Sequence, residues 1–402
     1  MTGATTGRAA TVRGGGVSRL GRSDRTAVGR WFWEIDRLLL LLVFVLICIG
    51  LVAVAAASPA AASRYSDATV TIGSLYYFKR QLIWVALALP VMIGVSMLSK
   101  DLARRFALGG AAFFSVLLAA VPLIGSTSNG STRWIGVGSV LIQPSEFLKP
   151  LFVVTIAWLF SLGQQDRSLP VMPLSAILLL LISVLLMKQP DFGQTIIYAG
   201  SWVVLLAFAG VSARLLGGIG VLGVIGVIAA YFFYPVATTR IDAFLYGHGD
   251  SYQTTNALGT LMAGGVFGAG PGEGVMKFRL PEPHTDYIFS VIGEEFGAIA
   301  CFAVALIYLA IVARVILKLL EEEDNFITLA AAGLVTEFGM QALINMLVNV
   351  KMAPSKGMTL PFISYGGSSM IALSIGFGLL LAFTRRNPYL NRSPYVVKWS
   401  GK

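Results

Sequence analysis

Apolar residues occur along this chain in ten long runs, which are separated by shorter polar stretches. A helix needs about 20 mainly apolar residues to cross the hydrocarbon core of a bilayer, and runs of that order predict membrane-spanning helices. The predicted spans are 38–57, 82–98, 107–124, 146–162, 174–187, 195–211, 217–235, 287–319, 326–350 and 368–383. The fold class expected from this pattern is an all-α polytopic membrane protein.

The composition agrees with this interpretation and excludes most alternatives. The chain is 56% hydrophobic and 12% charged, whereas soluble domains carry about 25% charged residues. A net charge of +10 suggests nucleic-acid binding, but membrane topology explains most of it, because many basic residues precede the first run or lie in short loops. No nucleic-acid partner is therefore expected. Cys48 and Cys301 lie inside apolar runs and indicate neither a disulfide framework nor a zinc site.

The charge distribution also predicts the orientation in the membrane. Residues 1–35 form an arm rich in Gly, Ser, Thr and Arg that we expect to be disordered and cytoplasmic. The first span is too long and too far from the N-terminus for a cleaved signal peptide. An even number of spans, within a membrane domain at 36–386, returns the short tail at 387–402 to the cytoplasm. Loops placed inside by this count contain Lys100, Arg104, Arg105, Arg167, Arg214, Arg314 and Lys318.

The longest outer connection, residues 236–286, joins the seventh and eighth spans and contains nine glycines. A structureless connection of this length is uncommon unless it has a function. Its glycines would allow the backbone to approach a ligand closely or to fold back along the membrane face.

The end of that connection carries the best candidate for an acid–base group. In the stretch 280–289, Asp286 and His284 lie where polar residues give way to the eighth span, so Asp286 could accept a proton at the bilayer surface. Glu294 and Glu295 follow inside the span. At about 100° per residue, Glu294 is about 80° around the helix from Asp286 and Glu295 nearly opposite. We therefore expect them to make interhelical contacts or to face a polar cavity, without forming a carboxylate dyad with Asp286.

Two further outer motifs allow both a structural and a functional interpretation. Arg133 and Trp134 could anchor a span at the membrane interface, where aromatic and long basic side chains are common. Glu146 fits the first turn of a helix capped by Ser145, and Lys149 is spaced to pair with Glu146. Lys149 also lies where the hydrocarbon begins, and charges inside the membrane are functional candidates.

Several basic residues lie on the predicted outer side, where positive charge is disfavoured by orientation. An anionic ligand such as a phosphate or pyrophosphate would explain them, although each one singly could be a solvated loop charge. This set consists of Arg133, Arg240, Lys277, Arg279, Lys351 and Lys356. Asp191, in the compact turn 188–194, is better explained as a structural residue that bonds its own backbone.

Six motifs, in this order, resemble those of the SEDS family (shape, elongation, division and sporulation), and most of all its division members. The resemblance covers nearly all of the chain after residue 35. The motifs are Asn129-Gly130 with Arg133-Trp134, Gln143-Pro144-Ser145-Glu146 with Lys149, Gln189-Pro190-Asp191-Phe192-Gly193, Leu280-Pro281-Glu282 with His284-Thr285-Asp286, Gly293-Glu294-Glu295, and Lys356-Gly357 with 360–369. Two departures are Tyr287, where phenylalanine is common, and 270–274, which replaces a serine-bearing stretch.

The resemblance implies a ten-span peptidoglycan glycosyltransferase that polymerises lipid II on the outer face of the bacterial inner membrane, at the division septum. It implies Asp286 as the catalytic base and undecaprenyl pyrophosphate as the leaving group. A divalent cation, Mg²⁺ or Mn²⁺, could assist, and no organic cofactor is expected. The implied partners are a class B penicillin-binding protein of the FtsI type and other division proteins. The expected substrate-binding set is Arg133, Trp134, Glu146, Lys149, Arg240, Glu282, His284 and Lys356.

Three other interpretations stay open at this point. Many spans with Glu294 and Glu295 inside one of them also suit a lipid II flippase, although no inverted repeat stands out. A polymerase of the elongation type would share the same motifs. A non-catalytic scaffold of the division machinery would use the basic arm and the tail to bind partners.

Overall fold

The structure is a computed structural model that describes residues 27–66, 71–128, 131–137, 140–247, 251–355 and 357–385. The described residues divide into two units, one that contains 27–35 and the other of Asp36–Arg385. In the first unit, residues Ala27–Glu34 form the helix α1. We had expected the whole arm to be disordered, and for this part of it the expectation was wrong. Residues 1–26 of the arm and the tail at 387–402 lie outside the described residues.

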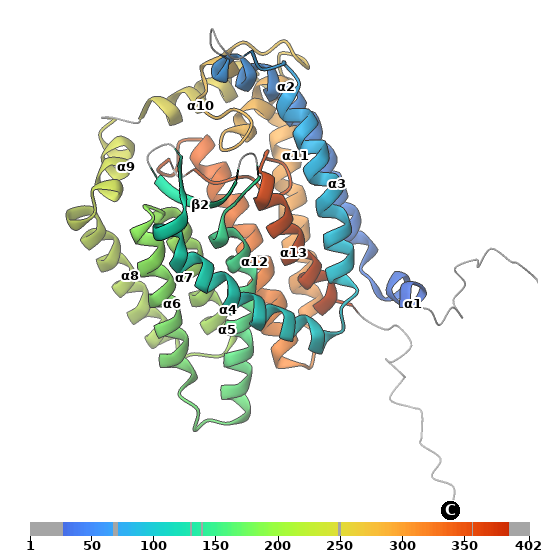
Figure 1. The fold of residues 1–402 in the computed structure, drawn as a ribbon, viewed down its shortest axis with the longest axis vertical. Coiled ribbons are helices and arrows are strands. Elements are labelled where there is room, and N and C mark those ends of the chain that lie inside the picture. Colours follow the sequence, from blue (N-terminus) through green and yellow to red (C-terminus); the bar gives the residue numbers. More distant parts are fainter. Residues whose placement is uncertain are drawn as a thin grey trace, which may run out of the picture. The chain divides into compact units, whose positions relative to one another are not determined.

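The second unit contains ten apolar helices among its described residues, which confirms the predicted polytopic fold (Figure 1). Eight of them are long and apolar enough to cross a membrane, and two, α7 and α13, are shorter apolar helices. The ten are α2 (Arg37–Tyr65), α3 (Tyr76–Ser96), α4 (Lys100–Ile124), α5 (Pro144–Gln165), α6 (Val171–Lys188), α7 (Phe192–Phe208), α8 (Ala213–Phe233), α11 (Ile288–Leu319), α12 (Asn325–Asn349) and α13 (Gly367–Phe383).

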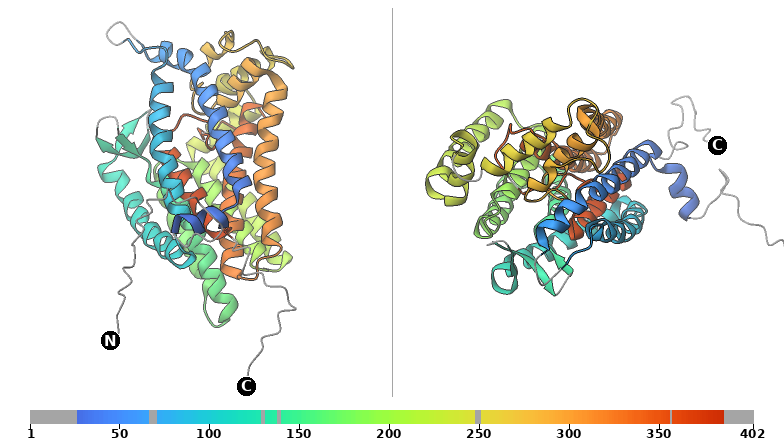
Figure 2. Two further views of the ribbon diagram at one scale, coloured as in Figure 1. Left: turned by 90° about the vertical axis from the view of Figure 1, so that its right-hand side faces the viewer. Right: turned by 90° about the horizontal axis from the view of Figure 1, so that it is seen from above.

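Helices α5 and α12 form the centre of this bundle. In their most apolar windows 72% and 67% of the residues are buried, against none in α8. Helix α12 packs against α5, α7, α11 and α13, whereas α8 lies at the edge and contacts α7 and α9 (Figures 1 and 2). Because lipid is as apolar as leucine, hydrophobicity alone does not bring helices together in a membrane. Polar residues buried in α5 and α12 are therefore expected to hold the helices together or to line a functional site.

One end of the bundle, the upper end in Figure 1, carries the additional structure. A small antiparallel sheet follows α4 there, with strands β1 (Ser126–Ser128), β2 (Ser131–Val137) and β3 (Val140–Ile142) in the order β1-β2-β3. Ser126 is paired with Trp134, and Ile135 with Ile142. The sheet, which the apolar pattern did not predict, presents β2 to the upper end of α5.

The connection 236–286 is folded and lies at the same end. It contains α9 (Pro235–Leu245), α10 (Ser251–Ala263) and the 3-10 helix η1 (Met276–Arg279). Its glycine-rich segment docks backbone to backbone onto α11, which is interrupted at Gly297 (φ 82°). The amides of Ala269 and Gly270 donate to the carbonyls of Glu294 and Glu295, at 2.8 and 3.1 Å. The glycines thus allow the connection to fold back onto a helix.

Side chains inside α11 hold this connection in place. The carboxylate of Glu294 accepts from the amides of Met276 and Lys277, at 2.6 and 2.9 Å. Glu295 accepts from the amide of Gly272 and forms a buried ion pair with Lys277. As expected, Glu294 and Glu295 form no dyad with Asp286. Lys277, however, is not available for the anion that we expected it to face, because its charge is balanced by Glu295.

Candidate active site

A polar cavity of about 390 Å³, the main cavity, opens at the upper end and unites most of the predicted site. Its walls come from β2, β3, the first turns of α5 and α7, the turn before α11, and the segment that leads into α13. The lining residues are Arg133, Trp134, Leu141, Gln143, Glu146, Gln194, Glu282, Thr285, Asp286, Gly357, Thr359, Tyr365, Gly366, Gly367 and Ser369. Five of the nine predicted site residues are in this set.

Asp286 lies in the turn that ends where α11 begins. The amides of Thr285 and Tyr287 donate to the carbonyl of Glu282, at 3.3 and 3.2 Å, and so close this turn. Burial raises the pKa of the Asp286 carboxyl, and the charge of Glu282 raises it further, so that it reaches about 7. The positive charges of Arg240 and Arg133 act in the opposite direction. A carboxyl group with this pKa can exchange a proton near neutral pH.

Glu282 lines the main cavity and is held by two hydroxyl groups. Tyr65, the last residue of α2, donates from its hydroxyl to Oε1 at 2.5 Å, and Thr285 donates to Oε2 at 3.0 Å. The two bonds fix the position of the Glu282 carboxylate. Glu282 therefore contributes negative charge beside Asp286.

Arg133 and Arg240 supply the positive charge. Arg133 donates from Nε to the carbonyl of Gln189 at 3.0 Å, and its Nη1 lies 3.9 Å from Oδ2 of Asp191. Asp191 caps α7 by accepting from the amide of Gln194, which confirms its structural role. Arg240, in α9, has its pKa lowered by burial and then by the like charge of Arg133. Arg133 lines the main cavity and Arg240 does not, although the charges of both act on Asp286. Two positive charges close to one carboxyl group favour an anionic ligand there.

Trp134 follows Arg133 in β2 and lines the same cavity. The residue is half-buried. The interfacial interpretation of this tryptophan and a role in the cavity are both consistent with this position.

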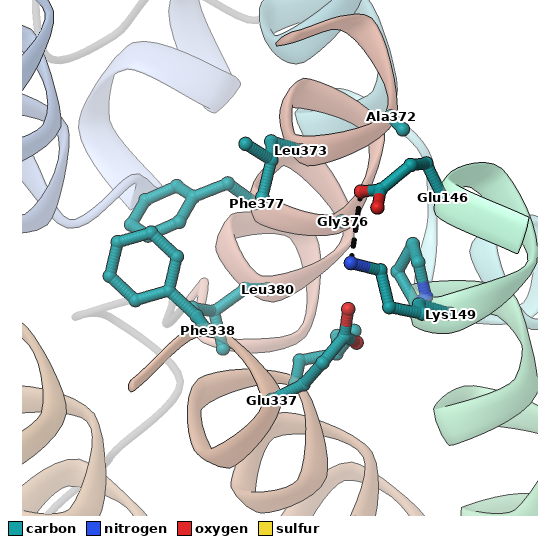
Figure 3. A pocket seen from close by; sticks show the side chains of 11 residues that line it. Glu146, Lys149, Glu337, Phe338, Ala372, Leu373, Gly376, Phe377 and Leu380 are labelled. Atoms are coloured by element: carbon teal, nitrogen blue, oxygen red, sulfur yellow. Dashed lines mark ion pairs between the residues drawn. The ribbon is translucent and has the colours of Figure 1, made fainter. Parts of the chain in front are cut away.

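Glu146 lines the main cavity and also a second, narrow cavity of about 20 Å³ below it (Figure 3). Lys149 lies in the lower cavity, and its Nζ is 2.9 Å from Oε2 of Glu146, which confirms the predicted pair. Glu337 of α12 also lines this cavity and points toward Lys149 in Figure 3. Lys149 is only 2% exposed and does not line the main cavity. The expected cap by Ser145 is absent, because α5 begins at Pro144 with no side-chain cap.

His284 is buried in an aromatic cluster and does not line the cavity. Its ring centroid lies 4.1 Å from that of Tyr77, 5.2 Å from Tyr365 and 6.4 Å from Tyr65. Burial lowers the pKa of His284 to about 4, so the imidazole is neutral. The His284 carbonyl accepts from the amide of Tyr365 at 2.8 Å. The structure thus gives His284 a place in holding the turn of Asp286, at a distance from any ligand in the main cavity.

Lys356 lies outside the described residues. Its neighbour Gly357 lines the main cavity, and a Cβ atom built on Gly357 would lie 3.4 Å from Oδ2 of Asp286. The chain therefore passes close to the Asp286 carboxylate at this point.

The sequence analysis did not identify the polar face of α12, which lies beside the site. On α12, polar residues recur at every fourth position and are buried among the bundle helices. They are Glu337, Gln341, Asn345 and Asn349. This spacing in an apolar run was the available signal, because residues four apart share one face of a helix.

Comparison with known proteins places this geometry in a family. The family model of FtsW, RodA and SpoVE, described as "Cell cycle protein", matches residues 36–389. The chain belongs to this family. It is a multi-pass membrane protein of the SEDS type, as the motifs suggested.

Two relatives of the SEDS family are both named "Probable peptidoglycan glycosyltransferase FtsW". The protein of Caulobacter vibrioides (strain NA1000 / CB15N) is 40% identical over 374 residues, which cover 91% of this chain and 93% of the relative. That of Trichlorobacter lovleyi is 34% identical over 360 residues, covering 87% and 92%. The similarity to FtsW proteins therefore extends over most of the chain.

Two solved structures have the same fold. One, described as "Structural coordination of polymerization and crosslinking by a peptidoglycan synthase complex", is 26% identical, with a TM-score of 0.72, and the match covers 87% of this chain and 97% of the other. The rod shape determining protein RodA of Thermus thermophilus is 25% identical, with a TM-score of 0.64, covering 87% and 96%. The bundle of ten apolar helices is thus the SEDS fold.

Proposed function

We propose that this protein is a peptidoglycan glycosyltransferase that polymerises lipid II into glycan strands during septal cell-wall synthesis. The observation that carries the proposal is the main cavity, in which Asp286 lies near two guanidinium groups. The names of the FtsW relatives support the same activity. The pKa of the Asp286 carboxyl, at about 7, suits proton transfer near neutral pH.

In the proposed reaction, the 4-hydroxyl oxygen of one lipid-linked sugar attacks the anomeric carbon of another. The bond between that carbon and the pyrophosphate oxygen breaks, and the configuration inverts. Asp286 takes the hydroxyl proton as the new glycosidic bond forms, and undecaprenyl pyrophosphate leaves. A positioned base contributes about 10²- to 10⁴-fold to the rate.

Arg133 and Arg240 are suited to the pyrophosphate that leaves. Their positive charges would stabilise the negative charge that develops on it, so the leaving group needs no second carboxylic acid, unlike that of most glycosidases. Mg²⁺ commonly binds through one or two carboxylates together with substrate phosphates. Among the described residues no group of three or more His, Cys, Asp or Glu side chains converges on one point. An Mg²⁺ or Mn²⁺ ion would therefore depend on the substrate phosphates, and when bound it would neutralise pyrophosphate charge.

The proposed orientation places the upper end outside the cell and both termini in the cytoplasm. It is supported by basic residues at the lower ends of the helices, such as Lys100 and Arg104 in α4 and Lys318 in α11. The cavity would then face exported lipid II, and the surrounding lipids would hold its undecaprenyl chain. We further propose a class B penicillin-binding protein of the FtsI type as partner, because a related structure concerns the coordination of polymerisation and crosslinking.

A flippase would need a path that continues below the main cavity. Below the main cavity lies the narrow one of about 20 Å³, which is lined by the Glu146–Lys149 pair. A cavity of this size accommodates about one water molecule. The geometry therefore favours a polymerase that works at one face of the membrane.

The test is polymerisation of purified lipid II by Asp286→Asn, a variant that keeps the size of the side chain. We expect a loss of about 10²-fold or more with normal membrane insertion. The control is Glu273→Gln, because Glu273 is an exposed acid of the same connection that does not line the cavity. It should retain wild-type activity. Wild-type polymerisation by Asp286→Asn would exclude the proposed base, and lipid II translocation without polymerisation would favour a flippase.

A further inference from the structure

The polar face of α12 runs from the lower cavity to the turn of Asp286. Its four members are between 0% and 6% exposed, although α12 is an apolar helix of the bundle. Polar groups at membrane depth need partners, because neither lipid nor water satisfies them there. The partners of three of them are backbone and side-chain groups around the main cavity.

Asn345 and Asn349 both bind the backbone of Asp286. Nδ2 of Asn345 donates to the Asp286 carbonyl at 2.9 Å, and Nδ2 of Asn349 donates to the same oxygen at 3.0 Å. These two bonds use both lone pairs of that carbonyl. Oδ1 of Asn349 accepts from the amide and hydroxyl of Ser290, at 3.1 and 2.7 Å, and thereby satisfies an amide in the first turn of α11.

Asn345 also joins the turn of Asp286 to the neighbouring 357–359 segment of the cavity wall. The same Nδ2 atom donates to the carbonyl of Met358 at 2.6 Å. One turn further down α12, Nε2 of Gln341 donates to the carbonyl of Thr359 at 3.0 Å. The two walls that carry Asp286 and Gly357 are therefore fixed to one helix.

Gln341 extends this connection to Lys149. Its Oε1 accepts from Nζ of Lys149 at 2.8 Å, and Lys149 pairs with Glu146. Gln341 thus bonds the cavity wall through its Nε2 atom and Lys149 of α5 through its Oε1 atom.

We propose that Asn345 and Asn349 are positioning residues that fix Asp286 against the 357–359 segment, and that Lys149 acts on the site through Gln341 without touching substrate. The inference rests on the proposed function, since it concerns the placement of its base. A carboxylate on a short turn moves with its backbone, and a displacement of about 1 Å at a reacting group can cost about 10²-fold in rate.

Movement of the turn would also change the electrostatic surroundings of Asp286. The charged groups that face it are Glu282 from its own turn, Arg240 from α9 and Arg133 from β2. Because Arg240 and Arg133 belong to other elements than the turn, a shift of the turn alters their distances from Asp286. A loss of positioning should therefore be visible in the pH dependence of the rate as well as in its size.

The experiment compares Asn345→Leu and Asn349→Leu with the wild type in the full-length protein, using purified lipid II at several concentrations and pH values. The matched control is Asn325→Leu, which is the same substitution at the exposed lower end of α12. We expect kcat to fall about 10- to 100-fold, KM to stay within about twofold because no cavity-lining side chain changes, and the acid limb of the pH–rate profile to move. The control should match the wild type in all three.

The outcomes separate this inference from the proposed function. If Asp286→Asn is inactive while both leucine variants keep the wild-type kcat and pH profile, the positioning role is wrong and the base assignment stands. If Asp286→Asn polymerises normally, both the base assignment and the positioning role are wrong. Should the leucine variants fail to fold, Asn345→Ser supplies the test, since it shortens the donor and keeps a polar group. An unchanged kcat and pH profile in Asn345→Ser overturns the inference.

Discussion

The buried pair of Glu146 and Lys149 allows a prediction that separates a structural from a ligand-binding role. Both side chains are nearly inaccessible, at 6% and 2% exposed. Removing one partner of such a pair costs about 3–5 kcal/mol, because the other charge is left uncompensated, whereas replacing both by neutral groups is often close to neutral. Lys149→Met should therefore destabilise the protein by about 3–5 kcal/mol.

The double variant Glu146→Gln with Lys149→Met removes both charges. It leaves Oε1 of Gln341 without the bond from Lys149, which costs about 1–3 kcal/mol. We therefore expect the double variant to be more stable than Lys149→Met alone. The coupling between the two sites in a double-mutant cycle should be at least about 2 kcal/mol.

The cycle is measured by denaturant unfolding of the purified protein in micelles, with the same samples assayed for polymerisation. Because Lys149 lies outside the main cavity, Lys149→Met should reduce kcat and leave KM for lipid II nearly unchanged. Additive losses of stability would show that the two charges are not coupled. An increased KM with an unchanged kcat would show instead that Lys149 binds the substrate.

Two further predictions concern the turn of Asp286 and the docked connection. In Glu282→Gln, loss of a negative charge should lower the pKa of Asp286 from about 7, so the acid limb of the pH–rate profile should move to lower pH. For each unit of that shift, the rate at low pH relative to the plateau should rise about tenfold, and an unmoved limb would refute this electrostatic role. Gly264→Ala would place a Cβ atom 2.0 Å from the carbonyl oxygen of Gly293, so it should cost at least about 1–3 kcal/mol in unfolding experiments. Gly259→Ala, in a helix with nothing within 4 Å, should be neutral or slightly stabilising, and equal losses in both variants would contradict the docking geometry.

The ten helices could be predicted because lipid imposes one requirement on every span. A run of apolar residues must be long enough to cross the hydrocarbon, and its length can be read without knowledge of its neighbours. The eighth predicted span, 287–319, differs from α11 by one residue. The first was predicted to end at residue 57, but α2 continues to Tyr65 through Pro59, because the bundle and its own small residues support the helix beyond the apolar run.

The same reasoning could predict only part of the candidate site. Asp286 and His284 are two residues apart in one motif, yet one lines the cavity and the other is buried among tyrosines. Their directions depend on the turn at 282–287, which is fixed by contacts with distant helices. Likewise, the pairing of Lys149 with Glu146 follows from helix spacing, whereas its contact with Gln341 depends on how α5 and α12 are rotated toward each other.

The sequence of α12 nevertheless contains information about how this helix is rotated. Asparagine and glutamine carry no charge, so a hydropathy window passes over them when it searches for spans. Each one still requires a hydrogen-bonding partner inside the membrane, and a spacing of four residues places all of them on one face. That face must therefore point away from lipid and toward other polar groups. Among the described helices packed on α12, α5 carries Lys149, which donates to Gln341 of this face. The polar spacing therefore constrains which surfaces of α5 and α12 meet.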